Sequence, residues 1–317
     1  ALVELGLVAA QGDGAHDFGL GRQLVEHVLL APAQQERGDA AGQALAPLST
    51  LGNTAFRELV AGYGGYGLLF SEMCWARSVP CGNGHDQGGF MWRSGENLQE
   101  LVCQIFGNDP ETMARAAAII EKEGFFGDDI NFGCSVAAVC KKQCGAALLR
   151  VPDKAAAIVA AVREAVDIPV FVKFRTGWED RPEAAVAMAR RFEAAGADAL
   201  TFHPRVAPDR RTRPPKWAYI ADVKSAVSIP VFGNGDIWEA HDALRMMRST
   251  SCDGVIVGRG CLGRPWLFRD LADVFDGRQP QDPPDFGEVI DILLEHAQGL
   301  CDWFGERRGT RMIRKFT

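Results

Sequence analysis

The chain lacks any long uninterrupted apolar run. It has 317 residues, of which 47% are hydrophobic and 24% are charged, the balance of an ordinary globular protein. No apolar stretch approaches the length that crosses a lipid bilayer. The N-terminal apolar stretch is interrupted by Glu4 and follows no basic residue, so it lacks the pattern of a signal peptide. We therefore expect a cytoplasmic protein that does not contact membranes.

An excess of positive charge is also lacking, since the formal net charge is −7. This argues against binding of nucleic acid through the overall charge, but it permits local basic patches. The nine cysteines are irregularly spaced and odd in number, which is typical of reduced thiols rather than of a disulfide framework. The sequence leaves the oligomeric state open, and we expect a monomer.

Short β-rich runs alternate with amphipathic helical patterns from about residue 44 onward. This alternation predicts parallel strands joined by right-handed crossovers. The eight candidate strands are residues 44–49, 67–73, 101–107, 128–133, 169–175, 199–205, 230–236 and 254–260.

A barrel and an open doubly wound sheet both fit this alternation, and two observations favour the barrel. Eight strands close a barrel whose interior side chains can fill. Polar and glycine residues lie where each strand ends, and in a barrel these ends meet at a single mouth. The near-repeat of "VREAVDIPVF" at 162–171 as "VKSAVSIPVF" at 223–232 fits regular winding. We therefore predict an α/β fold, a (β/α)8 TIM barrel.

Two segments fall outside the predicted barrel, which covers residues 44–280. Residues 1–43 are rich in Ala, Gly and Gln without clear periodicity, and we interpret them as a disordered or mis-started extension. Residues 281–317 contain one helical pattern and the start of a second. Because two helices cannot easily bury themselves alone, we predict a small C-terminal helical domain that is only partly present.

Two glycine-rich motifs follow the last two predicted strands, "GNGD" at 233–236 and "GRGCLGRP" at 258–265. In many barrels these two positions bind a phosphate through glycine amides and a helix N-terminus. Arg259 adds a positive charge there. A pair of tight turns is the alternative, but the joint placement of the motifs favours a phosphate site.

Lys173 and Arg175 lie two residues apart in a predicted strand, so their side chains point the same way. Two cations inside a barrel need an anionic or strongly accepting partner. A flavin is one such partner, because a cation near its N1 and O2 atoms stabilises the reduced ring. A core carboxylate such as Glu72 is the alternative. His203 and Gln104 also lie at strand ends, although each alone could be a structural residue.

Three cysteines lie within eleven residues of the stretch "NFGCSVAAVCKKQCGAALL". Cys134 follows Asn131 after the fourth strand, so we expect its thiol at the barrel mouth. Cys140 and Cys144 are predicted to share one face of a helix. The spacing matches no usual zinc or iron–sulfur site, and we predict no metal. A thiol with an ordinary pKa of about 8.5 is mostly protonated at neutral pH and can donate a proton to a carbanion-like carbon.

Taken in order, these motifs resemble the tRNA-dihydrouridine synthase family, FMN-dependent enzymes that reduce uridines in tRNA. The resemblance covers residues 44–317. It implies an FMN-dependent oxidoreductase that uses NADPH or NADH and has tRNA as its partner. The motifs that carry it are "LAPLSTLGNTAFREL", "SEM", "QIFGNDPE", "DINFGCS", "GAALL", "VKFRTGW", "FHPR", "NGDI" and "VGRGCLGRPWLF".

The resemblance also implies roles for individual residues. Cys134 would be the catalytic acid, protonating C5 of the uracil ring after hydride passes from flavin N5 to C6. Asn131, Arg175 and Arg205 would bind the substrate. The pyridine nucleotide would react only transiently, because the sequence has no dinucleotide-binding fingerprint. The residues implied to bind FMN are Pro47, Leu48, Ser49, Gln104, Lys173, His203, Asn234, Gly235, Asp236, Gly258 and Arg259.

Two other functions fit the same sequence. One is an FMN-dependent dehydrogenase of a free pyrimidine or a related small molecule, and the other is a non-catalytic RNA-binding remnant. Basic residues concentrate in "RVAPDRRTRPPKW" at 205–217 and in "ERRGTRMIRK" at 306–315, as contact with a phosphate backbone requires. Each patch alone could be ordinary solvated charge, so the patches fit the resemblance without proving it. The resemblance implies tRNA as the substrate, with the target base leaving its stack to reach the mouth.

Overall fold

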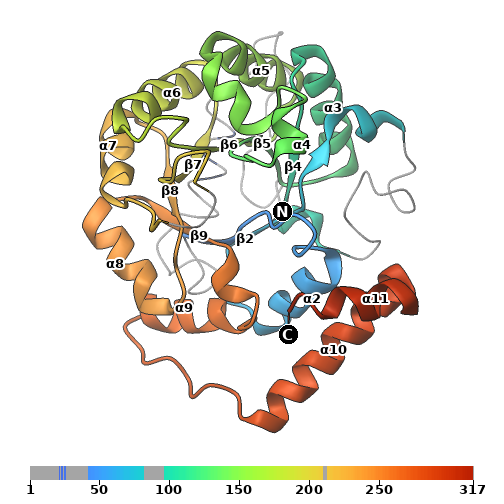
Figure 1. Ribbon diagram of the computed structural model, residues 1–317. Coiled ribbons are helices and arrows are strands. Elements are labelled where there is room, and N and C mark those ends of the chain that lie inside the picture. Colours follow the sequence, from blue (N-terminus) through green and yellow to red (C-terminus); the bar gives the residue numbers. More distant parts are fainter. Residues whose placement is uncertain are drawn as a thin grey trace.

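The strands close into a parallel barrel surrounded by helices (Figure 1). The computed structural model describes residues 42–81, 96–209 and 213–316, together with Gly21, Gln23 and Val25. β1 (Gln43–Leu45) pairs on one side with β2 (Leu68–Phe70) and on the other with β9 (Gly254–Val257), which closes the ring. The remaining strands are β4 (Leu101–Phe106), β5 (Gly127–Phe132), β6 (Val170–Arg175), β7 (Ala199–His203) and β8 (Val231–Asn234).

The second predicted strand, residues 67–73, is shorter in the structure, and a separate two-residue strand follows it. β2 ends at Phe70, and β3 (Cys74–Trp75) follows after a short break. β2 pairs with the first half of β4 and β3 pairs with the second half, both in parallel. The two segments therefore occupy one position of the barrel, and the predicted (β/α)8 arrangement is confirmed.

Helices surround the barrel in chain order, and local sequence signals define several of their ends. α3 begins after Asp109, whose side chain accepts a hydrogen bond from the backbone N–H of Thr112, and it stops at Gly124 in the left-handed conformation. α3, α5 and α6 each begin with proline, which suits the first helical position. The barrel helices are α2 (Thr54–Tyr63), α3 (Pro110–Glu123), α5 (Pro152–Ala165), α6 (Pro182–Ala194), α7 (Ala218–Ala226), α8 (Ala240–Thr250) and α9 (Leu267–Phe275).

Alternate side chains of each strand point into the barrel or toward the helices, and both sets are buried. Inside the barrel, Phe70 and Phe171 meet edge to face with ring centroids 5.5 Å apart. Val25, one of the described residues of the N-terminal stretch, is buried in the same cluster. Apart from Gly21, Gln23 and Val25, residues 1–41 of the predicted 1–43 extension lie outside the described residues.

The two predicted C-terminal helices are present as α10 (Phe286–Phe304) and α11 (Glu306–Ile313). They lie outside the ring of helices, beside α2 (Figure 1). Leu300 and Met312 pack with Ala55 of α2 in a small apolar cluster. Among the described residues, no helix is long and apolar enough to cross a membrane.

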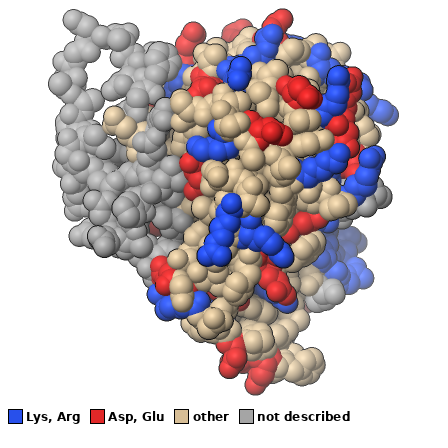
Figure 2. All heavy atoms as spheres, turned by 90° about the vertical axis from the view of Figure 1, so that its left-hand side faces the viewer, with Lys and Arg blue, Asp and Glu red and all other residues tan. Residues whose placement is uncertain are grey.

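Charges of both signs are mixed on the face that α6, α7 and α8 cover. Figure 2 shows Lys and Arg side chains interspersed with Asp and Glu side chains over this face. No field of a single sign develops there, so this view offers no broad surface for a polyanion.

Candidate active site

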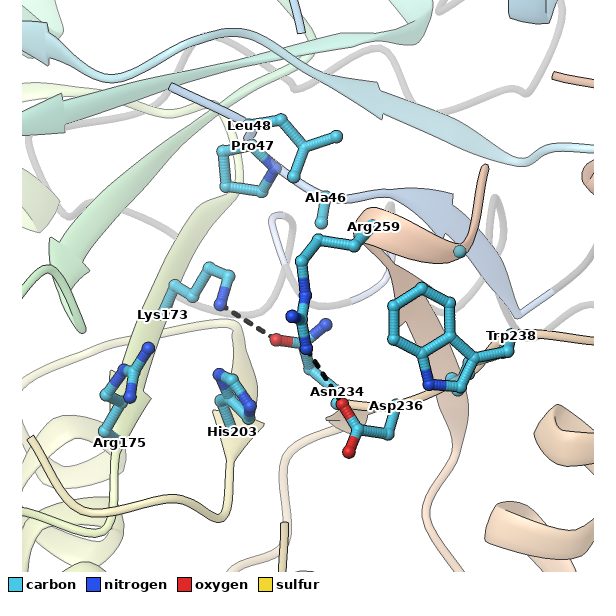
Figure 3. A pocket seen from close by; sticks show the side chains of 14 residues that line it. Ala46, Pro47, Leu48, Lys173, Arg175, His203, Asn234, Asp236, Trp238 and Arg259 are labelled. Carbon is cyan, nitrogen blue, oxygen red and sulfur yellow. Dashed lines mark hydrogen bonds and ion pairs between the residues drawn. The ribbon is translucent and has the colours of Figure 1, made fainter. Parts of the chain in front are cut away.

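A pocket opens where the carboxyl ends of β1, β6, β7, β8 and β9 meet (Figure 3). This is the mouth at which barrel enzymes carry their functional side chains. The pocket has a volume of about 200 Å³. Of the predicted residues, those that line it are Pro47, Leu48, Lys173, Arg175, His203, Asn234, Gly235, Asp236, Gly258 and Arg259.

Lys173 extends from β6 into the pocket and donates a hydrogen bond from Nζ to Asn234 Oδ1 at 3.1 Å. Burial lowers the pKa of Lys173 to about 8, although the carboxylate of Asp129 opposes this shift. Glu72, the alternative partner considered from the sequence, instead accepts a hydrogen bond from the backbone N–H of Thr50. The carboxylate that acts on Lys173 is therefore Asp129.

Arg175 lies two residues further along β6 and is largely buried. Its Nη1 donates to the backbone carbonyls of Val206 and Asp209, at 3.4 and 3.2 Å. Burial and, next, the charge of Arg205 lower the pKa of Arg175 to about 10. Within the described part of the chain it forms no ion pair, so its positive charge faces the pocket without a carboxylate on it.

His203 ends β7 and lies beside these cations. Burial lowers the pKa of His203 well below its ordinary value, and the charges of Arg175, Lys173, Arg205 and Arg259 act in the same direction. Nη1 of Arg205 lies 3.4 Å from His203 Nε2, a contact that suits an accepting ring nitrogen. The pocket therefore contains a neutral imidazole at neutral pH.

Two glycine-rich turns approach each other at the ends of β8 and β9. Gly235 has a φ of 122°, and a Cβ atom there would lie 2.8 Å from the His203 ring. A Cβ atom at Gly260 would lie 2.0 Å from the carbonyl oxygen of Ile237. A side chain at either position would collide with the neighbouring segment, so glycine allows the close approach that phosphate-binding loops also require.

Asp236 joins two arginines at this end of the pocket. Its Oδ1 lies 3.0 Å from Arg259 Nη2, and its Oδ2 lies 3.1 Å from Arg205 Nη2. Arg205, a predicted substrate-binding residue, does not line the pocket. Arg205 is buried and forms an ion pair with Asp236, which compensates the charge of Arg205.

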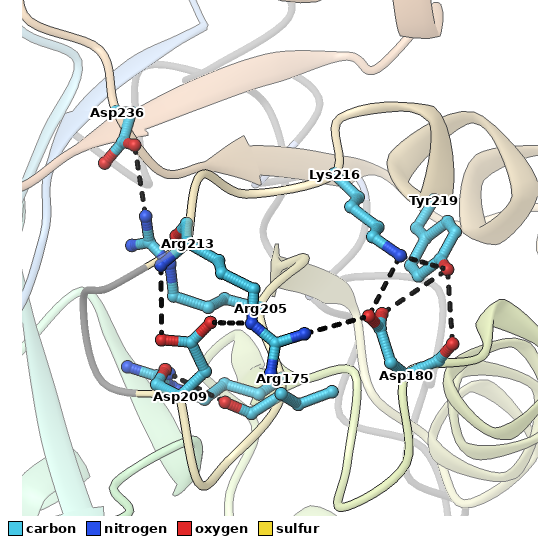
Figure 4. A network of polar contacts seen from close by, with 9 residues as sticks. Arg175, Asp180, Arg205, Asp209, Arg213, Lys216, Tyr219 and Asp236 are labelled. Atoms are coloured by element: carbon cyan, nitrogen blue, oxygen red, sulfur yellow. Dashed lines mark hydrogen bonds and ion pairs between the residues drawn. The ribbon is translucent and has the colours of Figure 1, made fainter.

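The basic segment that follows β7 is largely paired with acidic residues (Figure 4). Arg213 Nε lies 3.2 Å from Asp209 Oδ2, and Lys216 Nζ lies 2.9 Å from Asp180 Oδ2. Residues 210–212 lie outside the described part of the chain. The described part of this predicted basic patch therefore carries less uncompensated charge than its sequence indicates.

Cys134 lies in the loop after β5, and Asn131 holds that loop in place. Asn131 Oδ1 accepts hydrogen bonds from the backbone N–H groups of Gly133 at 3.1 Å and of Cys134 at 2.8 Å. The side chain of Cys134 is partly exposed. It is near enough to Lys173 and Arg175 that a thiolate there would raise the pKa of both. Cys134 therefore lies at the barrel mouth, as expected. Neither Cys134 nor Asn131 lines the pocket itself.

The prediction that Cys140 and Cys144 share a helix face is wrong. α4 (Ala137–Cys140) is only four residues long, and Gln143 adopts a left-handed φ of 56° that prevents the helix from continuing. Cys144 is buried against Phe106, whereas Cys140 is partly exposed. In the part of the chain that the structure describes, no group of three or more His, Cys, Asp or Glu residues could hold a metal ion.

Two of the predicted FMN-binding residues lie away from the pocket lining. Gln104 is buried in β4, where its Nε2 donates to Asp129 Oδ2 at 2.6 Å. Ser49 is exposed beyond Pro47 and Leu48. Gln104 can therefore contact a ligand only from inside the barrel. Ser49 can contact one only from the outer edge of the barrel mouth.

Sequence reasoning missed several residues of the site. Ala46, Ile237, Trp238 and Gly260 line the pocket beside the predicted residues. Asp129 was missed too, although one signal was present: it lies two residues before Asn131 in a strand and therefore on the same face. A carboxylate on the inner face of a barrel strand is rare without a polar partner.

Barrel, glycine turns, buried cations and cysteine loop together define the class: a (β/α)8-barrel enzyme with a mouth suited to an anionic ligand. The chain belongs to the dihydrouridine synthase (Dus) family, whose family model matches residues 44–317. The resemblance inferred from the motifs is thus confirmed, and with it the expectation of an enzyme.

Individual relatives agree with this family. The chain is 42% identical over 285 residues to a probable tRNA-dihydrouridine synthase of Mycobacterium tuberculosis, a match that covers 86% of this chain and 72% of that protein. It is 38% identical over 271 residues to tRNA-dihydrouridine synthase B of Pseudomonas aeruginosa, covering 86% of this chain and 81% of the relative.

Solved structures share the barrel at much lower sequence identity. A complex of 2-naphthoyl-CoA reductase with 2-naphthoyl-CoA has a TM-score of 0.54 and 14% identity, over 80% of this chain and 53% of that one. TcOYE with pHBA has a TM-score of 0.54 and 12% identity, over 83% of this chain and 95% of that one. At such identities the likeness concerns the fold alone.

Proposed function

We propose that this chain reduces uridine to 5,6-dihydrouridine in tRNA, with FMN as bound cofactor and NADPH or NADH as reductant. The observation that carries the proposal is the meeting of buried cations with a cysteine loop at one barrel mouth. Lys173 and Arg175 supply positive charge, and Cys134 supplies a proton within their electrostatic reach. Membership of the dihydrouridine synthase family indicates a reaction that needs both the positive charge and the proton donor.

The residues present fit FMN. Gly235, Gly258 and Gly260 line the pocket in turns of the kind that bind phosphate, and Arg259 adds a positive charge beside them. Lys173 is suited to the electron-rich side of the flavin ring, since its ammonium group is buried and has one neutral acceptor in Asn234. The pocket volume suits the phosphate end, and the ring would extend toward β5 and β6.

The proposed chemistry adds one hydride and one proton across the C5–C6 double bond of uracil. Bound FMN, once reduced, supplies the hydride to C6. Cys134 donates the proton to C5 from its thiol, and Asn131 fixes that thiol by holding the backbone N–H of Cys134. Arg175 donates hydrogen bonds to the accepting edge of the base.

We propose that tRNA contacts the C-terminal helices as well as the mouth, with residues 44–280 as the catalytic barrel and 281–317 as part of a tRNA-binding domain. Arg307, Arg308, Arg311 and Arg314 are exposed on or next to α11. Unlike the basic residues after β7, these arginines form no ion pair with a described acidic side chain, which suits them to phosphates. We further propose that the protein acts as a monomer in the cytoplasm.

The first test is the visible absorption spectrum of the purified protein. We expect flavin bands that bleach on anaerobic addition of NADPH and return when unmodified tRNA is added. Mass spectrometry of the digested tRNA should then detect dihydrouridine. Return of the bands with uridine monophosphate but not with tRNA would favour a dehydrogenase of free pyrimidines. A protein that binds no FMN at all would refute the proposal.

A further inference from the structure

A chain of hydrogen bonds runs inside the barrel from Asp129 to the cysteine loop. Gln104 Nε2 donates to Asp129 Oδ2 at 2.6 Å. Asn131 Nδ2 donates to Gln104 Oε1 at 2.8 Å, and Asn131 Oδ1 accepts from the backbone N–H of Cys134 at 2.8 Å. β4 contributes Gln104, β5 contributes Asp129 and Asn131, and Cys134 lies in the loop after β5, so the hydrogen bonds cross between neighbouring strands.

The groups at the two ends of this series of hydrogen bonds determine which group donates at each step. A backbone N–H can only donate, so Asn131 must turn its carbonyl toward Cys134 and its NH₂ group toward Gln104. Burial raises the pKa of Asp129 to about 7. In its ionised form this carboxylate can only accept, so Gln104 then turns its NH₂ group toward Asp129 and its carbonyl toward Asn131, as observed. Both ends require the same orientation of the two amides, and either amide flipped alone would place two donors or two acceptors together.

The side chains of Asp129, Gln104 and Asn131 are too deeply buried for water to replace a hydrogen bond lost by a flipped amide. Asp129 is 0% exposed, Gln104 is 1% exposed and Asn131 is 8% exposed. A buried donor that faces another donor loses its hydrogen bond without gaining one to solvent. The orientation of Asn131, on which the Cys134 loop depends, is therefore sensitive to Asp129, which lies two hydrogen bonds away through Gln104.

We propose that Asp129 is a positioning residue for the reaction, because it orients Gln104 and Asn131 and thereby holds the backbone of Cys134 where its thiol can protonate the substrate. Asp129 touches neither substrate nor thiol. The catalytic consequence rests on the proposed function, whereas the effect on the Cys134 loop does not.

The same strand provides a matched control. Asp128 is also fully buried, but it points to the opposite face of β5, and neither of its oxygens has a hydrogen-bond partner within the described residues. Asp128→Asn and Asp129→Asn are the same chemical change, one residue apart. Only Asp129→Asn replaces the acceptor-only end of the chain with an amide that can also donate.

The test measures how fast iodoacetamide alkylates Cys134 in the flavin-free protein, by peptide mapping, with partly exposed Cys301 as the internal reference. We expect Asp129→Asn to raise the rate at Cys134 about threefold or more by loosening the loop, and Asp128→Asn to leave it unchanged. With bound FMN, Asp129→Asn should slow reoxidation by tRNA about tenfold relative to Asp128→Asn.

Wild-type alkylation of Cys134 in folded Asp129→Asn protein would overturn the proposal, as would an equal change in Asp128→Asn. If Asp129→Asn does not fold, Gln104→Met carries the alkylation test, because it removes the same link without changing length or charge. A changed alkylation rate in a protein whose wild type never reduces tRNA would uphold the positioning role and reject the proposed function instead.

Discussion

At the scale of single residues, the site depends on charges held away from water. Lys173, Arg175 and Arg259 converge on one pocket, and burial lowers the pKa of Lys173 and of Arg175. Asp236 compensates Arg259, and Asn234 offers Lys173 a neutral acceptor only. The resulting excess of positive charge is what an anionic cofactor would neutralise, so substitutions here should affect binding and chemistry separately.

Replacing Cys134 with alanine should separate the two half-reactions. The flavin should still bind and still bleach with NADPH, because no residue of the phosphate end is altered. Dihydrouridine formation should fall by about 100-fold or more, since the proton donor is lost. Stopped-flow absorbance measures both steps, with Cys140→Ala as the control from the same loop. Equal loss of both half-reactions would contradict the role of Cys134 as the acid.

Replacing Arg259 with alanine should weaken FMN binding. Loss of a charged donor beside the phosphate, together with exposure of Asp236 to that phosphate, should raise the dissociation constant by about tenfold or more. Quenching of FMN fluorescence on titration measures the constant. Arg115→Ala, at an exposed ion pair on α3, is the control and should bind FMN as the wild type does. An unchanged constant in Arg259→Ala would remove this arginine from the cofactor site.

The pH dependence of FMN binding should report on Lys173. Its pKa is lowered to about 8, so the side chain is charged below that pH and neutral above it. Affinity should therefore fall as pH rises from 7 to 9. His203 does not contribute, because its pKa lies well below this range. Lys173→Arg stays charged throughout and should bind FMN with little change over the same interval. Parallel profiles for both proteins would assign the dependence to another group.

At the scale of elements, the amino-terminal side of the barrel is held by a buried ion pair. Arg163 of α5 lies 2.6 Å from Asp198, which precedes β7, and also donates to the carbonyl of Ile168 before β6. Asp198 Oδ2 further accepts from the backbone N–H of Val170. One arginine thus joins a helix to the start of two strands, on the side opposite to the active site.

Removing that arginine should destabilise the whole fold. Arg163→Ala leaves Asp198 as a buried charge, which should lower the free energy of unfolding by about 3–5 kcal/mol. Arg191→Ala breaks an exposed pair with Asp153 and should lower it by only about 0–1 kcal/mol. Urea unfolding followed by circular dichroism compares the two. Similar losses in both variants would show that burial does not set the strength of this contact.

At the scale of the whole molecule, the C-terminal helices are attached to the barrel through close packing. Gly309 of α11 lies against α10, where an added Cβ atom would come within 2.6 Å of the backbone N of Cys301. Leu300 and Met312 then meet Ala55 of α2. The position of the basic residues on α11 relative to the mouth therefore depends on whether the two helices can approach this closely.

Gly309→Ala should weaken tRNA binding without affecting FMN binding. Alanine favours helix over glycine by about 1 kcal/mol, so any loss must come from the contact between α10 and α11. Filter binding at fixed salt measures tRNA affinity, and fluorescence measures FMN affinity. Gly62→Ala in α2 is the control: a Cβ atom at Gly62 would have no neighbouring atom within 4 Å, so both affinities should stay unchanged. Wild-type tRNA affinity in Gly309→Ala would argue against a role for α11 in binding.

Much of this architecture follows from sequence periodicity. The sequence predicts the alternation of strands and helices and the polar residues at strand ends. It also predicts that Lys173, Asn234 and Gly258 converge, because barrel closure brings every strand end to one mouth. The short α4 could not, since the left-handed conformation of Gln143 is invisible in a pattern of helix-forming residues.

Local signals in the chain determined which segments became strands and helices and which side chains share a face, since these depend on neighbours within a few residues. Tertiary structure alone decided the partners: Arg205 with Asp236, Lys216 with Asp180, and Asp129 with Gln104. Those pairs lie far apart in the sequence or on different strands, and only closure of the barrel sets the distances and burial on which their charges and hydrogen bonds depend.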